Sequence, residues 1–226
     1  MGAYSLKVDP SGWNWIGALA DTGWAVSNTI IPLHLTRALA DEAKALHEAD
    51  RLSRAGIGRA DDHAVMSSVR WDKTRWMTRE SEVQAAYLDV MDSLRLALNE
   101  ALFLGLFSYE AHYAVYEPGG FYKRHFDAFK GTRNRVLSTV FYLNDDWRAE
   151  DGGTLDIFAD EASEVPITSI APEAGTMAIF LSEEIPHEVR STVRQRYSVA
   201  GWFRVNDRQT APGLQVVTGL SGVPIV

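Results

Sequence analysis

Two long stretches of the chain repeat apolar residues at the i, i+3, i+4 spacing of a helix with one buried face. The first runs from about Leu33 to Arg54 and the second from Ser81 to Leu104, with Gly105 as the expected stop of the second helix. A shorter helix is expected from Ser11 to Ala20. We therefore predict that helices dominate the first half of the chain.

From Phe107 onward, the pattern changes to short β-rich segments separated by turns such as Pro118-Gly-Gly. Gly23–Ile30 and Val69–Met77 have a similar β-rich composition, and residues 55–68 are expected to form a loop between the long helices. The strands predicted after Phe107 cover residues 109–116, 120–126, 136–143, 153–157, 163–170, 176–181, 188–191 and 196–205.

Helices followed by many short strands predict an α+β, mainly β protein in which a closed or sandwiched β domain is braced by two long helices. A length of 226 residues suits one domain with a sizeable core. We expect a single domain over residues 1–226, with helical and β support at 1–105, the β core at 106–205 and a tail at 206–226.

Composition narrows the function classes. The chain has no cysteine, which excludes disulfides, cysteine-ligated zinc and thiol catalysis, and a cytoplasmic location is expected. No apolar run is long enough to cross a membrane. A net charge of −8 without an overall basic footprint argues against nucleic-acid binding. We expect a monomer that binds neither membranes nor nucleic acids.

The candidate chemistry begins with His125 and Asp127, which are two residues apart in a segment expected to be extended. Side chains at i and i+2 of a strand project to the same side, so an imidazole and a carboxylate can meet at one point. His187, from a distant strand, can complete a set of two histidines and one carboxylate. This set marks non-haem Fe(II) oxygenases.

An iron oxygenase that uses 2-oxoglutarate also needs a cation for the far carboxylate of that co-substrate, and arginine suits this role best. Arg196 begins the last predicted strand. By the period-two rule, one face of that strand carries Arg196, Ser198, Ala200 and Trp202. One arginine, two small residues and one tryptophan predict a pocket wall rather than a plain core.

Several spaced motifs then carry a resemblance to the 2-oxoglutarate- and iron-dependent prolyl hydroxylases. The chain is most similar to the oxygen-sensing branch that modifies hypoxia-inducible factor in animals, and to its bacterial relatives. The similarity runs roughly from Trp24 to Arg204. The motifs are Tyr116, Tyr122, His125-x-Asp127, Tyr142-Leu-Asn-Asp-Asp-Trp147, Gly152-Gly-Thr-Leu155, Pro186-His187-Glu-Val189, Arg196-Tyr197 and Trp202.

The resemblance implies a double-stranded β-helix, the jelly-roll or cupin-like fold, around the site. It implies iron ligation and catalysis at His125, Asp127 and His187, and it places the 2-oxoglutarate carboxylate on Arg196. Further co-substrate contacts fall on Tyr142, Tyr116, Trp202, Val140 and Leu155. Fe(II), 2-oxoglutarate and O₂ are the implied cofactors, with ascorbate as a further expected ligand.

On the substrate side, the resemblance points to Arg70 and Asp72 in a loop that folds over substrate, with Asp72 near Arg135, and to Tyr122. The implied reaction is C4 hydroxylation of a prolyl residue in a protein, coupled to conversion of 2-oxoglutarate to succinate and CO₂. Bacterial members of this branch act on elongation factor Tu, which is therefore the leading expected partner.

Other interpretations remain open. The same chemistry could act on another residue or on a free small molecule, and a metal-binding β-barrel module could sense iron or oxygen without turnover. His125 and His187 could be core histidines, and Arg196 could form a buried ion pair. For His112, which precedes the motif, we expect a structural role rather than metal binding.

Overall fold

The computed structural model describes residues 14–55, 69–128 and 134–205. Its helices are α1 (Asn14–Thr22), α2 (Leu33–Glu48), α3 (Glu82–Leu102) and a short 3₁₀ turn (Ala149–Asp151). Its strands are β1 (Trp24–Ser27), β2 (Ser53–Arg54), β3 (Lys73–Trp76), β4 (Ser108–Tyr116), β5 (Tyr122–His125), β6 (Arg135–Tyr142), β7 (Leu155–Ile157), β8 (Thr168–Ile170), β9 (Met177–Leu181), β10 (His187–Val189) and β11 (Arg196–Arg204).

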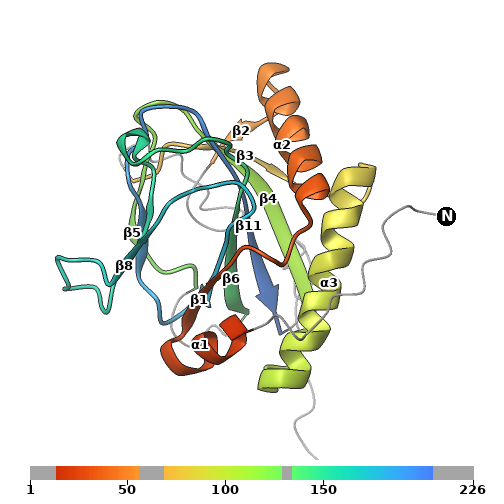
Figure 1. Ribbon diagram of the computed structural model, residues 1–226, viewed down its shortest axis with the longest axis vertical. Helices are drawn as coiled ribbons and strands as arrows, with labels where there is room; N and C mark the ends of the chain where they lie inside the picture. Colours follow the sequence, from red (N-terminus) through yellow and green to blue (C-terminus); the bar gives the residue numbers. More distant parts are fainter. Residues whose placement is uncertain (1–13, 56–68, 129–133, 206–226) are drawn as a thin grey trace, which may run out of the picture.

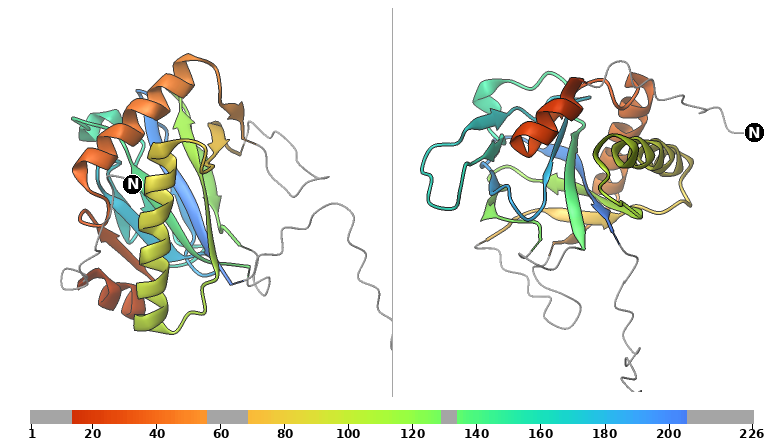
Figure 2. Two further views of the ribbon diagram at one scale, coloured as in Figure 1. Left: turned by 90° about the vertical axis from the view of Figure 1, so that its right-hand side faces the viewer. Right: turned by 90° about the horizontal axis from the view of Figure 1, so that it is seen from below.

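The strands form two antiparallel sheets that face each other (Figure 1). The larger sheet has the strand order β1-β9-β6-β11-β4-β3-β2, and the smaller has the order β5-β10-β7-β8. Helices α2 and α3 cover the face of the larger sheet that is turned away from the smaller one (Figure 2). The predicted mainly β class, braced by two long helices, is confirmed.

Alternation along the central strands separates two apolar cores. On β4, Tyr113 and Val115 belong to the core beneath the helices, whereas Ala114 and Tyr116 belong to the core between the sheets. Successive side chains of a strand point to opposite faces, so one strand supplies both cores. The interior between the sheets is therefore built from the even-numbered residues of β4.

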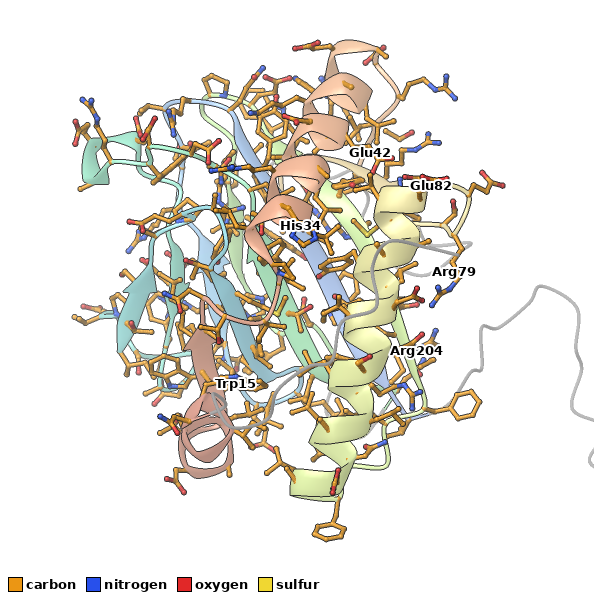
Figure 3. All side chains as sticks on the ribbon, turned by 45° about the vertical axis from the view of Figure 1, so that its right-hand side comes forward. Trp15, His34, Glu42, Arg79, Glu82 and Arg204 are labelled. Atoms are coloured by element: carbon orange, nitrogen blue, oxygen red, sulfur yellow. The ribbon has the colours of Figure 1, made fainter. Side chains whose placement is uncertain are left out.

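The two long helices are tied to the sheet by a polar contact as well as by apolar packing. Glu42 of α2 accepts hydrogen bonds from the Tyr113 hydroxyl (2.7 Å) and from the Gln84 amide (3.0 Å). Figure 3 shows Glu42 beside the start of α3. The N-terminus of α3 is capped by Ser81, whose hydroxyl accepts from the Gln84 N–H. These contacts fix the helices on the face opposite the second sheet.

Both long helices end earlier than their apolar spacing predicts. The first ends at Glu48 rather than Arg54, because Ser53 and Arg54 pair with β3 instead of continuing the helix. The second ends at Leu102, where Phe103 takes a left-handed conformation (φ 54°) before Gly105 is reached. Tertiary strand pairing and a helix cap thus override the helical periodicity.

Two predicted segments are not tested by the structure. The predicted loop 55–68 lies outside the described residues except for Ala55, and the predicted tail 206–226 lies entirely outside them. The single-domain boundaries therefore stay a prediction. Among the described helices, none combines the length and apolar character that a membrane crossing requires.

Candidate functional site

A cavity of about 320 Å³ lies between the two sheets. Its walls combine the inward face of the larger sheet, from β4, β6 and β11, with residues of β5, β7 and β10 from the smaller sheet. A sandwich of two antiparallel sheets leaves such a space where small side chains face each other. Ala114, Ser198 and Ala200 are small residues of the larger sheet that line it.

Strand pairing brings the two candidate histidines together. His125 of β5 and His187 of β10 are direct partners in the antiparallel register. Asp127 follows β5 in a turn held by the Ser182 carbonyl, which accepts from the N–H groups of Asp127 and Ala128 at 3.1 Å. One ligand atom from each of these three side chains lies within 4.8 Å of the others.

The histidines are oriented to present one nitrogen each to the carboxylate. The Nδ1 of His125 lies 2.8 Å from the Lys123 carbonyl, and the Nδ1 of His187 lies 3.0 Å from the Ile185 carbonyl. A carbonyl only accepts, so Nδ1 carries the proton and the lone pair is on Nε2. Backbone carbonyls of this kind commonly orient metal-binding histidines.

The spacing of the three groups fits a metal ion. The His125 and His187 Nε2 atoms lie 3.5 and 3.7 Å from the two oxygens of Asp127. Ligands about 2.1 Å from a metal and at right angles to each other are roughly 3 Å apart, so small side-chain shifts suffice. Among the described residues, this is the group of histidines and acids that could hold a metal ion.

Burial and charge keep these groups in the ionisation states that bind cations. Burial opposes ionisation of Asp127, but His187 and His125 outweigh it and hold the pKa of the carboxyl well below its usual range. Burial, together with the nearby His125, lowers the pKa of His187 to about 4. A neutral imidazole beside a carboxylate is the donor set that a divalent metal requires.

At Arg196, in the cavity wall, buried hydrogen-bond donors lack an acceptor among the described residues. Arg196 is 1% exposed, and its Nε donates to the Gly153 carbonyl at 2.8 Å. Within the described part of the chain, its Nη2 and the neighbouring Tyr142 hydroxyl have no hydrogen-bond partner. Burial raises the pKa of Tyr142 to about 12, so the hydroxyl keeps its proton. Two orphaned donors side by side fit a carboxylate ligand.

The predicted pocket face of the last strand is confirmed. Arg196, Ser198, Ala200 and Trp202 of β11 all line the cavity. The alternate residues Tyr197, Val199 and Phe203 pack in the core beneath the helices. The remaining residues expected near the co-substrate, Tyr116, Val140 and Leu155, also line the cavity, whereas Tyr142 is buried behind Arg196.

Three of the four expected substrate-side residues, Arg70, Tyr122 and Arg135, line the cavity. Asp72 is not among the lining residues and is held by two hydrogen bonds from Arg70 (2.7 and 2.6 Å). Arg135 donates to Glu110 at 2.8 Å. Asp72 and Arg135 thus each have an ion-pair partner of their own, and the expected proximity of Asp72 to Arg135 stays a prediction.

His112 and Trp76 line the same cavity and were not predicted to belong to the site. His112 is on the inward face of β4, as are Ala114 and Tyr116. The period-two rule, applied backward from Tyr116, would have indicated His112. Trp76 comes from β3, where His112 is its direct partner in the register, and only tertiary pairing shows this.

Burial of His112 predicts a pH dependence of stability. Desolvation, with the positive charge of Arg70, lowers the pKa of His112 from 6.5 to about 4. His112 therefore binds a proton below about pH 6.5 in the unfolded chain, but only below about pH 4 in the folded chain. Across this window, His112 lowers the free energy of unfolding by roughly 3 kcal/mol as the pH falls.

The neutral variant His112→Phe should lose less stability than the wild type between pH 6.5 and pH 4. Urea unfolding of the metal-free protein at several pH values measures the difference in slope between the two proteins. Equal slopes would contradict the buried, neutral state of His112.

Three comparisons relate this chain to known proteins. The family model described as the 2OG-Fe(II) oxygenase superfamily matches residues 111–204. The human protein "Egl nine homolog 1" is 27% identical over 198 residues, which is 83% of this chain and 45% of the human one. The chain spans about half the length of the curated relatives it matches, at 45% and 56% of the human and rat proteins.

Solved structures agree on the fold. A Pseudomonas putida prolyl-4-hydroxylase matches with a TM-score of 0.76 and 39% identity, over 84% of this chain and 97% of the other. A Trichoplax adhaerens prolyl hydroxylase, solved with a peptide fragment of hypoxia-inducible factor, matches with a TM-score of 0.71 and 21% identity, over 84% and 87% of the two chains. With the metal-fitting cluster and the buried Arg196 in one cavity, these matches show that the chain belongs to the 2OG-Fe(II) oxygenase superfamily, among the homologues of the prolyl hydroxylases.

Proposed function

We propose that this chain is an Fe(II)- and 2-oxoglutarate-dependent prolyl 4-hydroxylase that acts on a prolyl residue of a protein. The observation that carries the proposal is the joint presence, in one cavity, of a cluster that fits a metal and the Arg196 guanidinium, whose Nη2, like the neighbouring Tyr142 hydroxyl, lacks an acceptor within the ranges that the structure describes. The family implies the same set of cofactors, Fe(II), 2-oxoglutarate and O₂. A plain core or a bare metal site would not need both features.

In this proposal His125, Asp127 and His187 hold the iron through two Nε2 atoms and one carboxylate. Arg196, with the Tyr142 hydroxyl, holds the far carboxylate of 2-oxoglutarate. Arg196 Nε donates to the Gly153 carbonyl, and Nη1 lies 3.4 Å from the Ser198 hydroxyl oxygen. These contacts support the role, because they fix the guanidinium and leave Nη2 for the ligand. Tyr116, Val140, Leu155 and Trp202 form the walls around the co-substrate.

When bound, iron and 2-oxoglutarate supply the oxidising chemistry that uses O₂, releases succinate and CO₂, and leaves one oxygen atom on a substrate carbon. The share of the protein is positioning. The paired strands β5 and β10 hold the Nε2 atoms of His125 and His187 in place. Strand β11, which pairs with β6, fixes the position of Arg196 relative to these atoms.

We further propose a protein rather than a free amino acid as substrate, with elongation factor Tu as the first partner to assay, in the cytoplasm. The relative solved with a peptide fragment supports a polypeptide substrate. Arg70, Asp72, Arg135 and Tyr122 are the proposed contacts with it, and ascorbate is proposed as an accessory reductant.

The test is a succinate assay with Fe(II), 2-oxoglutarate and O₂ on a panel of substrates. We expect substrate-dependent succinate with elongation factor Tu or a proline-containing peptide derived from it. Free proline and unrelated small molecules should give only the background without substrate.

The panel separates the other interpretations. Succinate that rises only with a free small molecule would replace the protein substrate with that molecule. Tight iron binding with no succinate above background for any substrate would contradict an enzyme and favour a non-catalytic module that senses iron or oxygen.

A further inference from the structure

His112 is a buried imidazole in the cavity wall that the proposed reaction does not use. It is 6% exposed and lines the cavity from β4, where it pairs with Trp76 of β3 on one side and Ala200 of β11 on the other. Its ring lies beside two indoles, with centroids 5.1 Å from Trp76 and 5.4 Å from Trp202, and the two indole centroids are 6.1 Å apart. The indoles hold the ring in one orientation.

The hydrogen bonding of His112 defines its chemical character. Its Nδ1 lies 3.0 Å from the Tyr113 carbonyl, so Nδ1 carries the proton and Nε2 carries a lone pair. Within the described ranges, no protein group bonds to this Nε2. Arg70, Asp72 and Arg135 are the charged groups that face the ring, and the two cations oppose its protonation. His112 is therefore a neutral acceptor aimed at a cavity.

The proposed co-substrates cannot satisfy such an acceptor. At neutral pH, 2-oxoglutarate offers only carboxylate and keto oxygens, and O₂ has no hydrogen to donate. These ligands suit the donors Arg196 and Tyr142, and they would face electron-pair repulsion at His112. The partner of Nε2 must be a donor, and in a filled cavity the polypeptide is the ligand with N–H groups.

The prolyl residue itself cannot be that donor, because a proline inside a chain has no N–H. The donor must come from a residue beside it. We propose that His112 is a specificity-determining residue whose Nε2 accepts a hydrogen bond from a main-chain N–H next to the target proline. This inference rests on the proposed function and adds to it a contact with the main chain beside the target proline.

The exposed indole of Trp76 supports a chain at this place. Trp76 is 52% exposed although it lines the cavity, and Arg135 stacks on the buried Trp202 at 3.7 Å. An exposed aromatic beside a buried acceptor suits an extended peptide, which has apolar side chains and a regular series of N–H groups. A free amino acid would leave the Trp76 face uncovered.

The test compares His112→Met, which keeps the volume without a comparable acceptor, with His112→Gln, which can restore one. The probe is a synthetic elongation factor Tu peptide with one proline, titrated by calorimetry into protein loaded with Mn(II) and 2-oxoglutarate. We expect His112→Met to raise the peptide Kd about tenfold, the value of one hydrogen bond. In His112→Gln, the peptide Kd should rise less than in His112→Met. Neither variant should change the Kd of 2-oxoglutarate.

A second titration uses the same peptide with the main-chain nitrogens beside the proline methylated one at a time. At one position, methylation should weaken binding to the wild type and add little further loss in His112→Met, because both remove one hydrogen bond. Fully additive losses at every position, or an unchanged peptide Kd in His112→Met, would overturn the proposal and point to water as the donor.

The two proposals fail in different ways. If the wild type binds the peptide but never hydroxylates it, the proposed function fails while the comparison of His112 variants still decides this inference. If the wild type hydroxylates the peptide and His112→Met binds it equally well, only the inference fails. If no peptide binds at all, both are wrong.

Discussion

Asp127→Ala is expected to remove iron binding and, with it, all substrate-dependent succinate formation. Asp127 supplies the carboxylate of the cluster, and its two oxygens face the two Nε2 atoms at 3.5 and 3.7 Å. Without it, two neutral imidazoles face a divalent cation alone. Changes in residues that merely orient a ligand weaken metal binding about 10- to 100-fold, so loss of a ligand should exceed about 100-fold.

Anaerobic Fe(II) titration measures this loss, and the succinate assay follows the activity. Asp127→Asn serves as a second variant, since it keeps the shape of the side chain and should also fail to bind iron tightly. Asp41→Ala, an exposed acid on α2, is the matched control and should bind iron as the wild type does. Wild-type iron affinity in Asp127→Ala would show that the metal lies elsewhere.

The second large effect is expected at Arg196. Arg196→Met removes the buried cation whose Nη2 has no partner in the described protein, and it leaves the Tyr142 hydroxyl as the only donor there. Removing one side of a buried, hydrogen-bonded charge pair costs about 2–5 kcal/mol. The Kd of 2-oxoglutarate should therefore rise roughly 30-fold or more.

Arg196→Lys should show a smaller rise of about tenfold, because lysine keeps the charge but lacks the planar fork. Titration of 2-oxoglutarate into the Mn(II)-loaded protein measures both variants. Arg148→Met is the control, since that side chain is mostly exposed and is not among the residues that line the cavity. Unchanged co-substrate affinity in Arg196→Met would refute the carboxylate site, whatever happens to the metal.

The sequence predicted those parts of the site that depend on local geometry. His125 and Asp127 are two residues apart, so their proximity followed from the sequence, although Asp127 lies in the turn after β5 rather than on the strand. The pocket face of β11 followed from the same alternation, and the structure places Arg196 and Trp202 on that face. Patterns of this kind need no knowledge of which strands become neighbours.

What the sequence did not show depends on contacts between distant segments. The first long helix stops at Glu48 because Ser53 and Arg54 find partners on β3. Asp72 pairs with Arg70, whereas Arg135 pairs with Glu110. The character of His112 as a neutral acceptor arises only when the fold buries it beside Trp76 and Trp202.

The most direct test of the central claim is mass spectrometry of elongation factor Tu after reaction with the purified chain under ¹⁸O₂, with Fe(II) and 2-oxoglutarate. We expect one prolyl residue to gain a single heavy oxygen atom, in step with succinate, and to gain none when 2-oxoglutarate is omitted or Asp127→Ala is used. Succinate formed in step with an oxygen atom on a different residue type, or on no residue of the protein, would contradict a prolyl hydroxylase.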